Sequence, residues 1–169
     1  PDSRPVRRGH VMARIRMIYN YDQTASFQRL VVATGNKTEI LLGYATLHGD
    51  AACDLNPLAD LYKTQVRLMA AFMEIPQVII DKAPSADLWP GQTDEKELGF
   101  TYEEVDKLLY LLVEEGTTVE EALQAGFEEA FVETVVARVK DYRFKTLPTP
   151  TASIGQQTLA TLEKLPAFN

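Results

Sequence analysis

The chain has 169 residues, which is enough for one compact domain with a hydrophobic core. Its 17 Lys and Arg residues against 24 Asp and Glu residues leave a net charge of −7. This acidic balance argues against general binding to nucleic acids or anionic membranes, and no apolar run approaches the length of a membrane span. Cys53 is the only cysteine, which excludes an intrachain disulfide and fits a reducing compartment, so we expect a cytoplasmic protein.

The first part of the chain combines a long helix with a short strand. The stretch PDSRPVRRGH carries two prolines and three arginines before any periodic pattern, and we predict a loop there. Residues 10–27 place Val11, Ile15 and Ile18 at helical spacing, which predicts a helix. Residues 29–34 (RLVVAT) form a short apolar run rich in β-branched residues, which predicts a buried strand.

Further helices are predicted along the rest of the chain. Apolar spacing predicts helices over residues 38–47 and 59–73. In the second helix the residues expected to face inward are Leu61, Val66, Leu68, Met69 and Phe72. Capping boxes at Thr101 with Glu104 and at Thr118 with Glu121 open two more helices, the first running to about residue 115. A last helix is expected over residues 127–144, and residues 82–93 are expected to form a loop.

The predicted strand stands alone among these helices. A single strand cannot satisfy its own backbone hydrogen bonds, and a continuous apolar run is typical of a central strand in a parallel sheet. We therefore expect the partner strands to come from sequence upstream of residue 1. The chain is then part of an α/β domain.

The turn after the strand is the first candidate site. In open parallel sheets, ligands bind where the carboxyl end of a strand leads into a helix N-terminus. Thr34 ends the strand, Gly35 allows a sharp turn, and the N–H groups that follow are expected to face an anion. Glu39 lies one helical turn later, where its carboxylate could bind Mg2+. The alternative is a capped surface helix with a solvated glutamate.

Other polar residues carry two readings each. Asp50 and Asp54 are either acceptors for a ligand or turn residues that bond the backbone. Lys63 and the arginines Arg14 and Arg16 are either phosphate contacts or surface cations.

The long polar loop over residues 82–93 is of the kind that often covers a site. Trp89 within it either covers a closed site or anchors the loop to the rest of the domain. Asp94, just after the loop, either serves a metal or keeps the segment solvated. His10 and His48 show no spacing typical of a metal site or a catalytic triad, and we interpret His48 as a turn residue.

The strings GNKTEILLGY, DLNPLADLYKTQVR and KAPSADLWPGQTDEKELGFTYEEVDKLL closely resemble the ammonia-dependent NAD+ synthetase family. The similarity covers residues 13–112 and extends more weakly to residue 150. It implies a Rossmann-like adenine nucleotide alpha-hydrolase (ATP pyrophosphatase) fold of the α/β class, with this chain as its mostly helical C-terminal part. The family uses ATP to adenylate the carboxylate of deamido-NAD (nicotinic acid adenine dinucleotide), and ammonia then displaces AMP. Members are usually homodimers.

Carried over position by position, the resemblance implies roles for eight residues. The implied contacts with ATP are Thr34, Lys63 and Ser85, the implied Mg2+ ligand is Glu39, and the implied contacts with deamido-NAD are Arg14, Asp54, Tyr142 and Arg143. Glu39 and Lys63 are the implied catalytic pair, because a carboxylate-bound Mg2+ and a lysine stabilise the charge that develops during adenylyl transfer.

Several positions depart from the family pattern. Leu47 stands where many members carry a lysine that contacts the dinucleotide, and Ser85 stands where several carry threonine. A His-Lys pair near the family's C-terminus falls on Tyr142 and Arg143, which keeps the charge and loses the imidazole. The family's pyrophosphate-binding SGGxDS loop has no counterpart in these 169 residues, and we expect negligible synthetase activity from this polypeptide alone.

We expect residues 1–150 to be the C-terminal part of one synthetase domain and residues 151–169 to be a tail. Two alternatives to the ammonia-dependent enzyme are a glutamine-dependent synthetase, with a glutaminase domain upstream, and a non-catalytic remnant that binds nucleotide or dimerises. The retention of Thr34, Glu39, Lys63 and Ser85 argues against the remnant.

Overall fold

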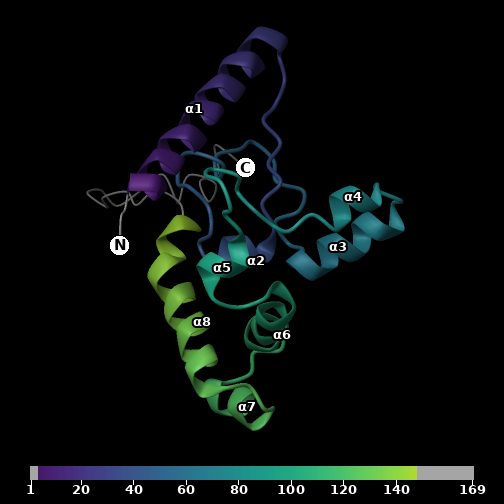
Figure 1. Cartoon of the computed structure of the whole chain (residues 1–169), viewed down its shortest axis with the longest axis vertical. Coiled ribbons are helices and arrows are strands. Elements are labelled where there is room, and N and C mark those ends of the chain that lie inside the picture. Colours follow the sequence, from purple (N-terminus) through teal and green to yellow (C-terminus); the bar gives the residue numbers. More distant parts are fainter. Residues whose placement is uncertain (1–3, 148–169) are drawn as a thin grey trace, which may run out of the picture.

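The computed structural model describes residues 4–147, and helices joined by loops make up nearly all of them. In chain order the elements are α1 (Arg4–Phe27), α2 (Lys37–Leu41), α3 (Lys63–Phe72), α4 (Gln77–Ile80), α5 (Asp94–Leu98), α6 (Tyr102–Val113), α7 (Val119–Gln124), α8 (Glu129–Tyr142) and the 3-10 helix η1 (Arg143–Lys145). Helix α1 lies at one end, α6–α8 at the other, and α2 and α5 between them (Figure 1). The tail expected over residues 151–169 lies outside the described residues.

Helices α6, α7 and α8 contribute most of the buried residues of the hydrophobic core. Both predicted capping boxes are confirmed: Thr101 accepts from the backbone N–H of Glu104, and Thr118 from that of Glu121. Helix α6 ends at Val113, two residues earlier than expected, and α8 spans 129–142 rather than 127–144. The fully buried aliphatic side chains of these helices are Val105, Leu108, Leu109, Val132 and Val135. Because these side chains are closely packed in the core, they hold α6 in a fixed position.

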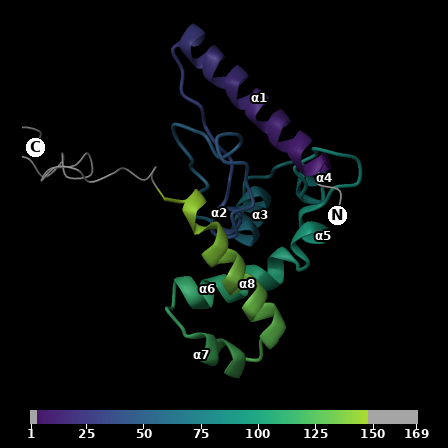
Figure 2. The same ribbon diagram turned by 90° about the vertical axis from the view of Figure 1, so that its left-hand side faces the viewer.

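Helix α1 begins at Arg4, so the predicted loop is wrong for residues 4–9. Proline is tolerated in a first helical turn because the N–H that it lacks would have no partner there, and Pro5 occupies such a position. The side of α1 that packs is the one with small residues, since Gly9 and Ala13 are buried whereas the apolar Ile15 and Ile18 are exposed. The buried residues of α1 thus lie in its first half, near the start of the helix (Figure 2).

Residues 29–34 do not form the buried strand that was predicted. Val32 makes an isolated parallel bridge with Leu55, the only β pairing among residues 4–147. The Ala33 N–H donates to the Leu55 carbonyl at 2.8 Å. One partner therefore comes from within the chain, contrary to the expectation of upstream partners alone. Leu30 and Val32 are exposed, because their side chains have no opposing layer among the described residues.

Helix α2 is shorter than the helix predicted over residues 38–47 and ends at Leu41. Gly43 has φ +62°, a left-handed conformation that ends the helix and favours glycine. Gly43 also touches α8: a Cβ at this position would lie 2.2 Å from the Cβ of Tyr142. The turn after α2 is thereby held against the end of α8.

Helix α3 begins at Lys63 rather than residue 59, and its predicted inward face is wrong. Leu68, Met69 and Phe72 are exposed, Phe72 to 88%, and α3 has no fully buried residue. Helical spacing shows which residues share a face but does not show what that face meets. Short helices α4 and α5 were not predicted, although the first-turn acids of α5 and the left-handed Gly99 after it are ordinary helix-end signals. No helix among residues 4–147 is long and apolar enough to cross a membrane.

The two glycines Gly43 and Gly99 provide a matched test of this packing. Both have positive φ, but a Cβ at Gly99 would meet nothing within 4 Å. We expect G99A to lower the free energy of unfolding by about 1 kcal/mol, the cost of left-handed backbone. G43A should lower it by about 3 kcal/mol or more, because the clash with Tyr142 adds to that cost. Urea unfolding measures the free energy of unfolding of both variants. Equal losses in G43A and G99A would contradict the close contact between Gly43 and Tyr142.

Candidate functional site

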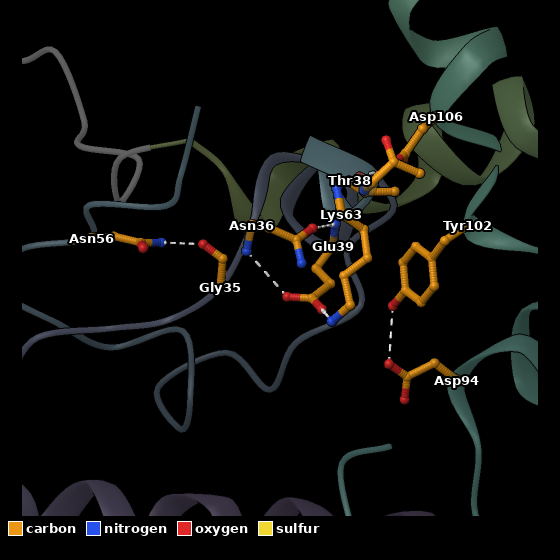
Figure 3. Close-up of polar contacts among 10 residues, drawn as sticks. Gly35, Asn36, Thr38, Glu39, Asn56, Lys63, Asp94, Tyr102 and Asp106 are labelled. Atoms are coloured by element: carbon orange, nitrogen blue, oxygen red, sulfur yellow. Dashed lines mark hydrogen bonds and ion pairs between the residues drawn. The ribbon is translucent and has the colours of Figure 1, made fainter. Parts of the chain in front are cut away.

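The turn after residue 34 is held by reciprocal hydrogen bonds. Asn36 caps α2 by accepting from the Glu39 N–H at 3.0 Å, and the Asn36 N–H donates to Glu39 Oε2 at 3.1 Å. The Lys37 N–H donates to the Leu61 carbonyl at 2.8 Å. The expectation that these N–H groups are free to face an anion is therefore wrong. Positive charge at the turn comes from a side chain instead (Figure 3).

That side chain is Lys63, which lies against Glu39. Lys63 Nζ is 2.8 Å from Glu39 Oε1, and both side chains are mostly shielded from solvent. The ammonium also lies 5.1 Å from the centroid of the Tyr102 ring, a cation–π contact. The structure thus brings together the two residues that the sequence analysis assigned to the chemical step.

Asp94, the first residue of α5, is a buried carboxyl group near this pair. It is 4% exposed and accepts from the Tyr102 hydroxyl at 3.0 Å through Oδ2. Its Oδ1 atom is buried and receives no hydrogen bond from the described residues. Burial raises the pKa of Asp94 above its ordinary value, although the hydrogen bond from Tyr102 and the charge of Lys63 oppose the shift. The sequence analysis left Asp94 between a metal role and a solvated segment, and burial excludes the second.

Three predicted site residues bond the backbone. Asp54 Oδ2 accepts from the Val31 N–H at 2.7 Å, which is one of the two readings given for it. Arg14 Nε donates to the Leu47 carbonyl at 3.2 Å. Ser85 Oγ donates to the Gln92 carbonyl at 2.8 Å and accepts from the Asp87 N–H, so it closes the loop over residues 82–93 on itself. Asp54 and Ser85 therefore shape the loops that carry them, whereas Arg14 links α1 to the segment at Leu47.

A cavity of about 510 Å³ lies beside the turn. Thr34 lines it, as do Arg16 of α1 and Trp89 of the loop over residues 82–93. Glu39 and Lys63 do not line it. Leu88 and Trp89 pack against α1 at Gly9, where a Cβ would lie 2.8 Å from Leu88 Cδ1. This loop therefore forms one wall of the cavity, and its contact with α1 matches the anchoring role considered for Trp89, whereas a covering role stays a prediction.

The end of α8 and the 3-10 helix η1 that follows it form the basic wall of the cavity. Tyr142 and Lys145 line it, whereas the exposed Arg143 does not. Lys145 Nζ donates to the Gly43 carbonyl at 2.6 Å and to the Ala45 carbonyl at 2.7 Å, and lies 4.8 Å from the centroid of the Tyr142 ring. Burial lowers the pKa of Lys145, and the nearby Arg138 charge lowers it further. The sequence analysis missed Lys145, because its signal is spatial: α8 ends opposite the turn at Gly43.

Comparison with known proteins places this chain in a family. The family described as NAD synthase matches residues 1–149. The chain belongs to this family. It is 48% identical over 159 residues to the NH(3)-dependent NAD(+) synthetase of Trichlorobacter lovleyi, covering 94% of this chain and 58% of that protein. The corresponding enzyme of Wolinella succinogenes is 50% identical over 154 residues, covering 91% of this chain and 60% of that protein. The chain thus spans under two thirds of the length of these NAD synthase relatives.

Solved structures of the family share the fold. The NMN synthetase from Francisella tularensis superposes with a TM-score of 0.76 at 36% identity, over 89% of this chain and 58% of that one. The NH3-dependent NAD synthetase from Campylobacter jejuni, in complex with the nitrate ion, gives a TM-score of 0.67 at 29% identity, over 86% of this chain and 55% of that one. These neighbours are consistent with the nucleotide-binding alpha-hydrolase fold.

The residues of this NAD synthase chain fit a shared magnesium ion rather than a closed metal site. Among residues 4–147, no three His, Cys, Asp or Glu side chains gather into a metal cluster. Mg2+ that bridges phosphates usually takes only one or two protein carboxylates and fills its other positions with water and phosphate oxygens. Glu39 offers one such carboxylate, and the unpartnered Oδ1 of Asp94 is a second acceptor nearby.

Asp94 gives a pH-dependent prediction. The raised pKa of Asp94 means that its carboxyl group binds a proton more tightly in the folded protein than in the unfolded chain. The ionised carboxylate therefore lowers the free energy of unfolding at pH values above the folded-state pKa. This loss disappears as the pH falls towards the unfolded-state pKa, which is about 4. We expect D94N to raise the free energy of unfolding at pH 7 by about 1 to 2 kcal/mol, since it removes a buried charge with one unpaired oxygen. Urea unfolding across pH should show this advantage shrinking below neutral pH. An advantage that grows as pH falls would contradict the assignment.

Proposed function

We propose that the protein takes part in forming NAD+ from deamido-NAD, ammonia and ATP, with AMP and pyrophosphate as the other products. The observation that carries this proposal is the Glu39–Lys63 pair at the turn. It occurs in a chain about half identical to proteins named NH(3)-dependent NAD(+) synthetase. That naming favours ammonia over glutamine as the nitrogen source, and the intact pair argues against a non-catalytic remnant.

The proposed reaction has two steps. A carboxylate oxygen of deamido-NAD attacks the α-phosphorus of ATP, the bond to pyrophosphate breaks, and the carboxylate carries AMP. Ammonia then attacks the acyl carbon, the C–N bond forms, AMP leaves with the electrons of the C–O bond, and the nitrogen gives up a proton. Negative charge moves onto phosphate oxygens in both steps, so fixed positive charge nearby lowers the barrier.

Lys63 supplies such a charge on the ATP side. Its ammonium is held between Glu39 and the Tyr102 ring, and we propose that it meets a phosphate oxygen of ATP there. Thr34, at the cavity edge, and Ser85 are the proposed hydroxyl contacts with ATP. Glu39 is the proposed Mg2+ ligand, and bound Mg2+ would neutralise charge on the phosphates.

The cavity is the proposed site for part of deamido-NAD. Its basic wall, formed by Tyr142 and Lys145, suits a phosphate group. Arg14, Asp54 and Arg143 lie outside the cavity, and we propose that they meet the dinucleotide in a homodimer. The exposed apolar residues of α1, which also carries Arg14, support such an assembly.

We further propose that this chain corresponds to the C-terminal part of the family's domain and that the protein is cytoplasmic. The exposed apolar side chains of Leu30 and Val32 on an extended segment support the first, because they are suited to meet further layers of an α/β fold. The single cysteine, Cys53, supports the second.

The activity test compares Glu39 with an exposed glutamate. The 169-residue chain should have negligible activity alone. The same chain joined to the SGGxDS-containing segment of a synthetase relative should form NAD+ from deamido-NAD, ammonia and Mg-ATP. E39Q should lower kcat on the order of 100-fold, since it removes the carboxylate that binds the metal. The control E133Q changes an exposed carboxylate of α8 and should leave the rate unchanged. Undiminished activity in E39Q would contradict the proposal.

A second test compares Lys145 with Lys140. K145M removes the cation that lines the cavity, and we expect KM for deamido-NAD to rise on the order of tenfold, the usual value of one charged hydrogen bond. The control K140M removes an exposed cation of α8 that does not line the cavity, and it should change KM less than twofold. Steady-state kinetics of the joined chain measures both. A larger rise in KM for the control than for K145M would contradict binding of the dinucleotide in the cavity.

A further inference from the structure

We propose that Asp106 is a positioning residue that holds Glu39 and Lys63 in contact with each other. The inference rests on the proposed function, because that reaction gives the pair its role. Asp106 lies in the first part of α6 and touches neither the cavity nor the pair directly. It acts through Thr38 and through the first residues of α3 (Figure 3).

The contacts of Asp106 form a short buried network. Thr38 Oγ1 donates to Asp106 Oδ1 at 2.6 Å and accepts from the Lys63 N–H at 2.9 Å. The Thr64 N–H donates to Asp106 Oδ2 at 2.8 Å. One carboxylate therefore bonds the neighbour of Glu39 on α2 and the neighbour of Lys63 on α3. Asp106 is 4% exposed and Thr38 is fully buried, so water competes little for these bonds.

Apolar packing does little to fix the two helices against each other. Thr38 is the only fully buried residue of α2, and α3 has none. The core residues Leu42 and Tyr62 lie just outside the two helices, after α2 and before α3. Between these two core residues, the position of Glu39 relative to Lys63 therefore depends on polar contacts. The hydrogen bonds of Asp106 are the buried contacts among them.

The network caps α3 with side chains from outside that helix. Gln65 Oε1 accepts from the Tyr62 N–H at 2.9 Å, and the first-turn N–H groups of Lys63 and Thr64 bond Thr38 and Asp106 instead. The capping boxes of α6 and α7, by contrast, use residues within the same helix. Asp106 instead comes from 42 residues beyond Thr64 and 68 beyond Thr38. Its negative charge near the start of α3 is also favourable to the helix dipole.

Helix α6 supports the pair at two points one turn apart. Tyr102 places its ring under the Lys63 ammonium, and Asp106 fixes the Lys63 backbone through Thr38. Val105 and Leu109, on the same helix, are buried in the core and keep α6 in place. Helix α6 thus positions both the backbone and the ammonium group of Lys63.

The test measures the coupling between Glu39 and Lys63 rather than stability alone. E39Q, K63M and the double variant are compared by urea unfolding of the 169-residue chain. In the unsubstituted background the coupling should change the unfolding equilibrium constant by about threefold, typical of a partly exposed ion pair. In a D106N background we expect this coupling to disappear, because the amide cannot accept from both Thr38 and Thr64.

V105A is the matched control. It removes buried volume from the neighbouring residue of the same helix and lowers stability without touching the network. The coupling should remain about threefold in the V105A background. If D106N retains as much coupling as V105A, Asp106 only stabilises the fold and the proposal is wrong.

A second pair of variants decides the question where D106N does not fold. T38V removes the hydroxyl and keeps the shape of the side chain, and should abolish the coupling, whereas T38S keeps the hydroxyl and should restore it. Equal coupling in T38V and T38S would overturn the proposal. The coupling is measured without ligand, so it is independent of catalysis. Absence of NAD+ formation in every variant of the joined chain would reject the proposed function and leave the coupling result to decide on Asp106.

Discussion

The buried hydrogen bonds between Asp106, Thr38 and the start of α3 are the contacts on which the candidate site depends. Helices α2 and α3 bury no apolar side chain fully, so a hydrophobic core alone does not set the distance between their first residues. Hydrogen bonds are directional where apolar contacts are not. A buried polar junction therefore fixes the geometry of Glu39 and Lys63 more tightly than aliphatic packing of the same area.

In the same geometry, both carboxylate oxygens of Glu39 already have hydrogen-bond partners. Glu39 uses one carboxylate oxygen for the Asn36 N–H and the other for Lys63. A cation that binds Glu39 must therefore share or displace the Lys63 ammonium, and an anion that binds Lys63 must weaken its contact with Glu39. The metal–phosphate complex proposed for this site would resolve both at once, because it would bring a cation for the carboxylate and an anion for the ammonium. The pair would thus favour the joined ligand over either ion alone.

Local signals predicted the parts of this structure that local contacts build. The capping boxes at Thr101 and Thr118 need only four residues each, and both are confirmed. The buried strand over residues 29–34 and the inward face of α3 were wrong because burial depends on what lies opposite, which periodicity does not report. Glu39 and Lys63 were found by resemblance and meet in space. Asp106 and Lys145 were missed, since each acts on residues far away in the chain.

Helix α5 joins the two halves of the site. Asp94, at its first residue, accepts from Tyr102, which also carries the Lys63 ammonium on its ring. Glu97, three residues later, accepts from the Tyr44 hydroxyl at 2.7 Å, and both of these residues line the cavity. The loop over residues 82–93 leads directly into this helix and forms a cavity wall through Trp89. Helix α5 thus connects Tyr44 and Glu97, which line the cavity, with Asp94, which bonds the tyrosine beside the Lys63 ammonium.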